Sequence, residues 1–369
     1  MANSISTKKL RILHVAKWFP NRNDVQNGVF IQKHVACTTQ FADVKVLAWL
    51  QGESKTEVVE SIENGMAITR VYFKKKTAVS YKRHALRNYI QGHYNNKELP
   101  DLVHLHIFSP DLLLVVNWAK KRNIPVVISE HWSGYIRGIF DQMPKWRKMA
   151  YRQLAKKVDV ILPVSEFLQD HMIACKMKGT YQIVPNIVEQ NTHTPPKQKQ
   201  FSFVVIADLV DEIKNVSGII RAFESIEHNS LLHIIGGGPD EEKIKNLVDH
   251  SPKKEQIKLY GRLANDEVLK LLPTFYCLIN NSRVESFGVT VLEAHAASIP
   301  VISTKCGGPD EWLEEGDYAI ELDDENGLKM AMTNVINDKQ NQFQFIKWKE
   351  CLPDQVGKKL KSIYEHLVG

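Results

Sequence analysis

Short apolar segments of strand type alternate with segments of helical period along almost the whole chain of 369 residues. Strands that are apolar on both faces are typical of a parallel sheet that helices cover on both sides. In the first half the expected strands are 11–16, 44–49, 68–73, 102–107, 126–129 and 160–163, with helical stretches such as 110–122 and 145–157 between them. This alternation predicts a doubly wound α/β layer.

A polar stretch at 191–200, which contains a Pro-Pro pair, interrupts the alternation and is typical of a linker. Beyond it the alternation resumes, with expected strands at 203–207, 231–235, 256–260, 276–279 and 300–303. We therefore predict an α/β fold of two Rossmann-like doubly wound domains, 1–190 and 191–353, facing a central cleft. A C-terminal helix at 354–369 is expected to pack back onto the first domain.

Several classes of protein are excluded by pattern. The longest apolar runs, such as 112–116, fall far short of the roughly 20 residues of a membrane-spanning helix. Residues 1–9 are polar, and Arg11 and His14 interrupt the apolar stretch that follows, so the core of a signal peptide is not recognisable. The five cysteines are widely spread without a C-x-x-C pair, and no zinc-ligand spacing is found. We expect a cytoplasmic protein with reduced thiols and no bound metal.

The two halves of the chain carry opposite charge. Residues 1–190 hold 28 Lys and Arg against 15 Asp and Glu, whereas 191–369 hold 20 against 27. A basic run at 145–157 interleaves Trp146, Met149 and Leu154 at helical spacing, which indicates an amphipathic helix with a basic outer face. Such a face suits an anionic membrane surface. An ordinary solvated face and a nucleic-acid contact are the alternatives, and no nucleic-acid-binding motif supports the latter.

The most informative stretch begins at Glu285 and ends in a Gly-Gly pair. Seven residues separate Glu285 from Glu293, and Phe287-Gly288 opens an expected helix between them. Backbone N–H groups at a helix start favour an anion, and a glycine there lets a ligand approach closely. Carboxylates accept hydrogen bonds from vicinal hydroxyls of a sugar or a ribose. The structural alternative is that Ser286 caps the helix and both glutamates are solvated.

This stretch, with its Glu, Phe-Gly, Glu-Ala, Pro-Val-Ile and Gly-Gly elements between Glu285 and Gly308, resembles the family 4 glycosyltransferases, retaining enzymes of the two-domain GT-B type. The resemblance covers most of the chain and implies that domain 1–190 is the acceptor side and that domain 191–353 binds the nucleotide sugar. It implies transfer of a sugar from a UDP- or GDP-linked donor, with retention of configuration and without a metal ion or other cofactor. The implied acceptor is a saccharide or a polyprenyl-linked saccharide of cell-surface polysaccharide biosynthesis, met at the inner face of the cytoplasmic membrane.

The resemblance also implies roles for single residues of the motif. Glu285 would hold the hydroxyls of the donor sugar and Glu293 the ribose. The backbone amides of Phe287, Gly288 and Val289 would face the phosphates or the sugar.

Two residues of the first half match the family pattern. Gly28, after the first strand, resembles the glycine whose backbone contacts the diphosphate, and a plain turn is its alternative. His131, at the end of the strand 126–129, resembles the histidine near the reacting sugar. Together with Glu285 and Lys214, His131 is the predicted catalytic group.

The chain departs from the family where the donor phosphates are expected. The family commonly has an arginine followed by a lysine, but here Asp208 stands at the arginine position and one residue is inserted before Lys214. A carboxylate beside a diphosphate is electrostatically unfavourable. We expect Lys214 to be the main phosphate ligand and Arg262 to replace the missing arginine, with surface salt bridges as the alternative for both. A sugar-nucleotide epimerase and a non-catalytic sugar-nucleotide scaffold are the rival functions.

Overall fold

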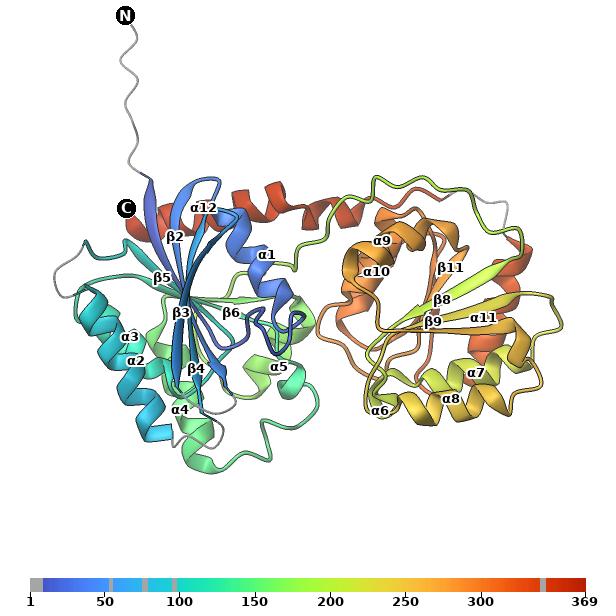
Figure 1. Cartoon of the computed structure of the whole chain (residues 1–369), viewed down its shortest axis with the longest axis horizontal. Helices are drawn as coiled ribbons and strands as arrows, with labels where there is room; N and C mark the ends of the chain where they lie inside the picture. The colour runs from blue at the N-terminus through green and yellow to red at the C-terminus, as the bar shows by residue number, and fades with distance from the viewer. Residues whose placement is uncertain (1–8, 53–55, 75–78, 95–97, 339–342) are drawn as a thin grey trace, which may run out of the picture. The chain divides into compact units, whose positions relative to one another are not determined.

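The computed structural model describes residues 9–52, 56–74, 79–94, 98–338 and 343–369 and divides into two compact units (Figure 1). The first unit comprises residues 1–187 with 353–369, and the second comprises 188–352. The sequence predicts these boundaries after residues 190 and 353. Residues 1–8, which bear on the expected lack of a signal peptide, lie outside the described residues. Within the described ranges, no helix combines the length and apolar character that a membrane crossing requires.

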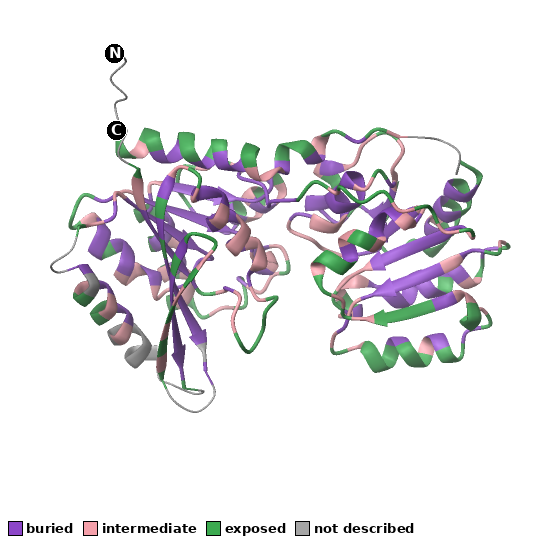
Figure 2. Ribbon diagram, turned by 45° about the horizontal axis from the view of Figure 1, so that its top comes forward, coloured by how far each residue is buried: buried purple, intermediate pink, exposed green. Residues whose placement is uncertain are grey.

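The first unit is built on a sheet of seven strands. Their order is β3 (Glu57–Glu63), β4 (Met66–Phe73), β2 (Ala42–Gln51), β1 (Leu10–Ala16), β5 (Leu102–His106), β6 (Val126–Glu130) and β7 (Val160–Pro163). Every neighbouring pair is parallel except β3 with β4. The central strands are buried on both faces (Figure 2), as their continuous apolar sequences predict.

Strand β3 is absent from the sequence-based prediction. Its side chains alternate between half-buried and exposed, and three of its seven residues are glutamates. It pairs antiparallel with β4 at the edge of the sheet. A strand in this position borders solvent, so it does not need the continuous apolar run that marks the buried strands.

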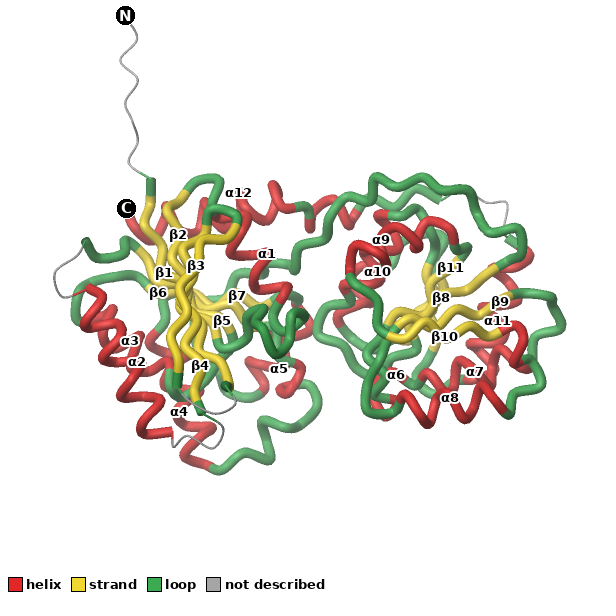
Figure 3. Tube along the Cα trace, viewed as in Figure 1, coloured by secondary structure: helices red, strands yellow, loops and turns green. Residues whose placement is uncertain are grey.

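Helices cover both faces of this sheet (Figure 3). On one face α1 (Val29–Thr38) packs against α12 (Pro353–Val368), and both contribute to one hydrophobic core with the strands. On the other lie α2 (Val79–Tyr94), α3 (Leu112–Lys120) and α4 (Lys145–Lys157), while α5 (Glu166–Ala174) follows β7. The C-terminal helix therefore completes the core of the first unit.

The second unit repeats the architecture with six parallel strands. Their order is β10 (Ile257–Gly261), β9 (Leu231–Ile235), β8 (Ser202–Ile206), β11 (Cys277–Asn280), β12 (Val301–Thr304) and β13 (Tyr318–Ile320). One face carries α7 (Val216–Glu224), α8 (Glu241–Asp249) and α11 (Glu325–Asn337), and the other carries α9 (Asn265–Leu271) and α10 (Val289–Ala296) (Figure 1). The predicted pair of Rossmann-like layers is confirmed.

The polar stretch 191–200 is held against the second unit. The Asn191 side chain donates a hydrogen bond to the Leu269 carbonyl (2.7 Å), and the ammonium of Lys197 donates to the Phe275 carbonyl. The Tyr276 hydroxyl donates to the Gln198 carbonyl (3.1 Å). The stretch has neither helix nor strand, as predicted for a linker, but these bonds fasten it to the domain that follows.

Candidate functional site

The predicted donor-binding side chains of the second unit follow the carboxyl ends of its strands. Lys214 ends the short helix α6 (Asp211–Lys214), which follows β8. Arg262 directly follows β10, and Glu285 lies between β11 and α10. Because the carboxyl ends of parallel strands share one edge of the sheet, the fold collects these side chains where ligands of such sheets bind.

Lys214 and Glu285 form an enclosed ion pair. The Lys214 ammonium lies 2.8 Å from Glu285 Oε1, and the two side chains are 24% and 15% exposed. Burial by itself would lower the pKa of Lys214, but the Glu285 carboxylate outweighs it and raises that pKa above its ordinary value. The Ser282 hydroxyl donates to the same carboxylate oxygen (2.7 Å). Ser282 was not foreseen, because a serine in a loop gives no signal of its own.

The backbone of Glu285 is fixed by the Gly-Gly turn after β12. The Glu285 amide donates to the Cys306 carbonyl, and the Gly308 amide donates to the Glu285 carbonyl, both at 3.0 Å. A Cβ atom at Gly308 would come within 2.4 Å of the Phe287 nitrogen. The glycine that ends the sequence motif is thus required by a close approach of two backbone segments.

Helix α10 begins at Val289, directly after Gly288, whose φ of 94° lies in the left-handed region that favours glycine. The N-cap is therefore Gly288 and not Ser286, which was the expected alternative. The Phe287 side chain is buried against Trp312 with ring centroids 5.2 Å apart, so only its backbone can serve a ligand. The next amide, at Val289, opens the helix.

Glu293 lies within α10 and is 5% exposed, so neither motif glutamate is a solvated surface charge. The structural alternative, in which both carboxylates face water, is therefore wrong.

Asp208 and Arg262 lie against each other. Arg262 Nη2 donates to Asp208 Oδ1 (2.7 Å) and to the Gly237 carbonyl (2.9 Å). Both side chains are more than half exposed, at 65% and 53%. Arg262 thus forms an exposed salt bridge of the kind expected as its alternative, whereas the ion pair of Lys214 is enclosed and is not a surface salt bridge. The roles of Lys214 and Arg262 in binding phosphate stay predictions. The Asp208 carboxylate, which departs from the family pattern, is paired with the Arg262 cation.

Gly28 and His131 lie near each other in the first unit. Gly28 is the N-cap of α1 with φ of 70°, and a Cβ atom there would come within 2.6 Å of the Trp18 backbone. Two residues on, the Phe30 ring packs on His131 with centroids 4.6 Å apart. His131 Nδ1 lies 2.9 Å from the Asn186 side-chain oxygen. Burial, with a smaller effect of His34, lowers the pKa of His131 well below its ordinary value, so the ring is neutral.

Glu130, which the sequence analysis did not single out, is fully buried beside His131. Its carboxylate accepts hydrogen bonds from the backbone amides of Phe108 (3.0 Å), His131 (2.8 Å) and Trp132 (2.8 Å). Burial raises the pKa of Glu130 to about 7, although these bonds favour the charged form. The available signal was an acidic residue at the end of an apolar strand.

One histidine cluster among the described residues has the spacing of metal ligands. Ligand atoms of His14, His104 and His106 lie within 4.8 Å of one another, and all three side chains are fully buried. His14 Nδ1 lies 3.0 Å from His106 Nε2, while the two nitrogens of His104 contact the hydroxyls of Tyr364 (2.5 Å) and Ser129 (2.8 Å). The rings thus use these nitrogens for hydrogen bonds within the core.

Two family models match the chain. The model described as Glycosyl transferases group 1 matches residues 188–349, and the model described as Glycosyltransferase Family 4 matches residues 43–191. An uncharacterized glycosyltransferase of Methanocaldococcus jannaschii is 26% identical over 308 residues, which cover 80% of this chain and 83% of the relative. The alpha-monoglucosyldiacylglycerol synthase of Acholeplasma laidlawii is 26% identical over 65% of this chain and 67% of its own length.

Solved structures share the fold at low identity. A glycosyltransferase from Rickettsia africae superposes with a TM-score of 0.75 at 15% identity, over 98% of this chain and 99% of the other. The Anabaena protein HepE, in complex with UDP-glucose, superposes with a TM-score of 0.69 at 13% identity, over 97% and 98% of the two chains. These likenesses confirm the predicted GT-B fold.

Proposed function

The chain belongs to the glycosyl transferases group 1, and from this premise we propose that it moves a sugar from a UDP- or GDP-linked donor to a saccharide or polyprenyl-linked acceptor. The transfer retains the anomeric configuration and uses no metal ion. The observation that supports this proposal is the enclosed Lys214–Glu285 pair next to the start of α10. That arrangement offers a fixed cation, backbone N–H groups and a carboxylate within one domain.

The charge that develops in this reaction is on the leaving group. As the bond between the anomeric carbon and the phosphate oxygen breaks, negative charge grows on the departing nucleoside diphosphate. Lys214 is held positively charged by Glu285, and the amides at the start of α10 add oriented dipoles. Preorganised groups of this kind stabilise the transition state because they need no rearrangement during the reaction.

Glu285 has the right position to bind the donor sugar. Both hydrogen bonds that the described residues make to its carboxylate go to Oε1. Its second oxygen, Oε2, is therefore available to accept a bond from a sugar hydroxyl. Lys214 and Ser282 would keep the carboxylate oriented while it does so.

Retention needs no strong protein base in this proposal. The acceptor hydroxyl attacks the anomeric carbon on the face that the diphosphate leaves, and its proton passes to the departing phosphate oxygen. One C–O bond breaks and one forms, and the leaving diphosphate takes up the proton of the acceptor hydroxyl. The catalytic role of His131 stays a prediction, and the lowered pKa makes its neutral imidazole a weaker proton acceptor than an ordinary histidine.

Replacing Lys214 or Glu285 by Ala tests the proposal. We expect transfer to fall about 10²- to 10³-fold in each variant, the range seen when one preorganised donor is lost. Lys305→Ala is the control, because Lys305 pairs with Glu321 on the exposed surface of the same domain. Circular dichroism verifies folding. Near-normal transfer in both site variants would refute the assignment.

Incubation with radiolabelled UDP- and GDP-sugars distinguishes the rival functions. A transferase without acceptor releases free sugar slowly, an epimerase yields an isomeric nucleotide sugar, and a scaffold yields neither. The UDP-glucose bound in the Anabaena structure supports UDP as the first donor nucleotide to try.

The basic first domain supports an acceptor at the inner face of the cytoplasmic membrane. Helix α4 buries Tyr151, Leu154 and Ala155 and exposes Trp146 (60%) and Met149 (57%) beside its lysines. The lipid product named for the Acholeplasma relative agrees with such an acceptor. A role in cell-surface polysaccharide synthesis would follow from a polyprenyl-linked saccharide at this surface.

A further inference from the structure

Lys214 ends the helix α6, which is only four residues long. Asn215, the residue that follows, has a left-handed φ of 46° and stops the helix. A helix of one turn is not stable by itself, because too few backbone hydrogen bonds form to offset the entropy lost on ordering it. The chain also departs from the family pattern here, by the residue inserted before Lys214. The position of Lys214 must therefore be set by contacts from outside α6.

A single arginine provides most of these contacts. The backbone amide of Arg283 donates to the Ile213 carbonyl (2.7 Å). Its guanidinium Nη1 donates to the carbonyls of Asp211 (3.2 Å) and Glu212 (3.0 Å). The last carbonyls of a helix have no hydrogen-bond partner within the helix. Arg283 thus supplies donors to the three consecutive carbonyls that directly precede Lys214.

The guanidinium of Arg283 is itself held in place. Its Nε and Nη2 both lie close to Asp323 Oδ1, at 2.9 and 2.7 Å. The two side chains are 38% and 58% exposed, so this ion pair alone would add little to stability. A planar guanidinium has enough donors to bind a carboxylate and backbone carbonyls at the same time. The ion pair therefore orients the guanidinium for its bonds to α6.

The neighbours of Arg283 in the chain extend the contact. The Asn281 side chain, two residues before Arg283, donates to the Asn215 carbonyl (3.1 Å). Glu285, two residues after Arg283, pairs with the Lys214 ammonium. The two segments are therefore joined on both sides of the lysine. Lys214 and its carboxylate partner keep their separation only while these bonds persist.

We infer that Arg283 is a positioning residue, which holds the backbone of α6 so that the Lys214 ammonium stays in place for the donor phosphates. The inference rests on the proposed function, in which Lys214 binds those phosphates. Arg283 acts through Lys214 and needs no contact with the donor. Because it acts through hydrogen bonds to carbonyls, its charge alone would not be sufficient.

Hydrogen exchange followed by mass spectrometry tests this anchor independently of activity. The amides of residues 213–215 form the hydrogen bonds of α6. We expect Arg283→Ala to raise their exchange about tenfold or more, because two hydrogen bonds to the helix are lost. Arg221→Ala is the matched control, because Arg221 pairs with Glu325 on the exposed surface of the same domain. Equal exchange in the two variants would overturn the inference.

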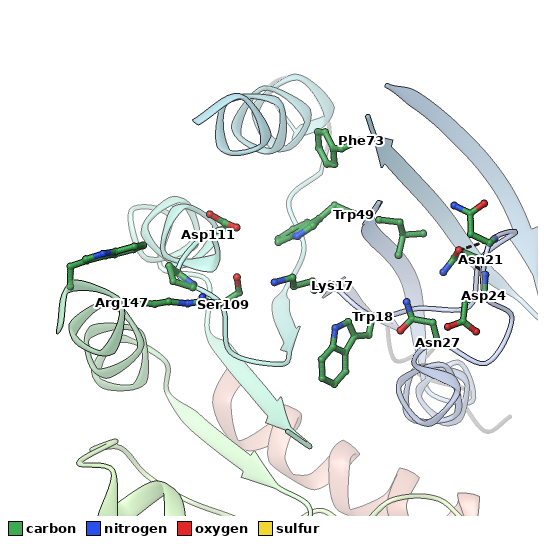
Figure 4. A pocket seen from close by; sticks show the side chains of 14 residues that line it. Lys17, Trp18, Asn21, Asp24, Asn27, Trp49, Phe73, Ser109, Asp111 and Arg147 are labelled. Atoms are coloured by element: carbon green, nitrogen blue, oxygen red, sulfur yellow. Dashed lines mark hydrogen bonds between the residues drawn. The ribbon is translucent and has the colours of Figure 1, made fainter. Parts of the chain in front are cut away.

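A second control lies in the first unit. Arg147 lines a pocket of about 520 Å³ there, together with Trp18, Trp49 and Trp146 (Figure 4). Because Arg147 belongs to the other compact unit, Arg147→Ala should leave exchange in residues 213–215 as it is in the unaltered chain. A rise as large as that in the Arg283 variant would mean that α6 responds to the loss of any arginine, and the inference would fall.

Hydrolysis of the nucleotide sugar without acceptor measures the consequence for the site. We expect Arg283→Ala to lower kcat about 10- to 100-fold, with a smaller change in KM, because a displacement of about 1 Å misplaces the cation where charge develops. Arg283→Lys should restore little of this rate, since lysine keeps the charge but lacks the fork of donors. Recovery of most of the rate would show that the charge acts directly, which would overturn the inference.

A double-mutant cycle separates an effect through Lys214 from an independent one. In a chain that already carries Lys214→Ala, we expect Arg283→Ala to change the rate of hydrolysis less than about twofold. Equal losses in both backgrounds would overturn the inference. Near-normal hydrolysis by Lys214→Ala alone would contradict the proposed function, whereas the exchange experiment would still decide whether Arg283 anchors α6.

Discussion

Asp208 shows how one residue can disturb a family pattern and still be accommodated. A donor phosphate is expected close to the Asp208 carboxylate. The same carboxylate forms a 2.7 Å ion pair with Arg262. While that pair exists, Arg262 shares its charge with a protein carboxylate. The pair should therefore compete with a diphosphate for the same guanidinium.

Asp208→Asn should increase the affinity for UDP or GDP about three- to tenfold, because it removes a negative charge and releases Arg262. Arg262→Ala should lower the affinity by a similar factor. Isothermal titration calorimetry measures both, with Glu321→Gln as a control for loss of an exposed carboxylate paired with a lysine. Weaker nucleotide binding by Asp208→Asn would show that Asp208 serves the site by positioning Arg262.

At the scale of the element, the C-terminal helix α12 is tied into the core of the first domain by a tyrosine. Tyr364 is fully buried, and its hydroxyl contacts His104 Nδ1 on β5 at 2.5 Å. Tyr364→Phe should lower the free energy of unfolding by about 1–3 kcal/mol, because it leaves a buried histidine nitrogen without its partner. Urea denaturation measures the change.

Tyr260→Phe is the control for this bond, because Tyr260 makes the same contact with His233 (2.9 Å) but is 38% exposed. Water can replace its hydroxyl, so we expect a much smaller loss. Equal losses in the two variants would mean that burial of the Tyr364–His104 contact adds nothing.

Helix α4 is the element on which the membrane proposal depends. Each basic side chain near anionic headgroups contributes about 1 kcal/mol. Lys145→Glu with Lys156→Glu should abolish flotation with anionic liposomes, whereas Lys258→Glu with Lys329→Glu, an equal change of charge on exposed residues of the second domain, should not. Binding that is insensitive to salt, or lost equally in both pairs, would contradict a contact through α4.

At the scale of the whole molecule, the two domains should respond differently to acid. Among the described residues of the first unit, five histidines are buried, namely His14, His34, His104, His106 and His131. Burial lowers the pKa of His14 to about 3 and that of His34 to about 4, and it lowers the other three pKa values well below the ordinary range. Their contribution to stability is complete above pH 6.5, the ordinary histidine pKa, and is lost as the pH falls toward the lowered values.

Glu130 acts in the opposite direction. Its pKa is raised from 4.5 to about 7, so its contribution is complete below pH 4.5 and is lost as the pH rises through about 7. At about pH 5, each histidine that must stay neutral in the folded state lowers the free energy of unfolding by about 2 kcal/mol. The loss from five histidines therefore exceeds the gain from one carboxyl.

We therefore expect the first domain to lose stability before the second when the pH falls from about 7.5 to about 5. Hydrogen exchange followed by mass spectrometry, corrected for the intrinsic effect of pH, resolves the two domains. Equal loss of protection in both would contradict the expectation.

The sequence alone determined the architecture of two Rossmann-like domains and the motif between Glu285 and Gly308. Both are encoded locally, because a buried parallel strand needs a continuous apolar run, and the turns around Gly288 and Gly308 tolerate no side chain. Periodicity also placed most helices and strands. It did not predict β3, because a strand at the edge of the sheet does not need the continuous apolar run by which the buried strands are recognised.

Tertiary structure decided which distant residues meet. The pairing of Lys214 with Glu285, of Arg262 with Asp208, and of His104 with Tyr364 joins residues far apart in the chain. The burial of Glu130 and the tryptophan-lined pocket likewise depend on strands whose order in the sheet differs from their order in the sequence. The spacing of apolar residues in the sequence indicates which face of an element is buried. Only packing in space brings particular side chains within hydrogen-bond distance, and the chemistry of the site depends on those distances.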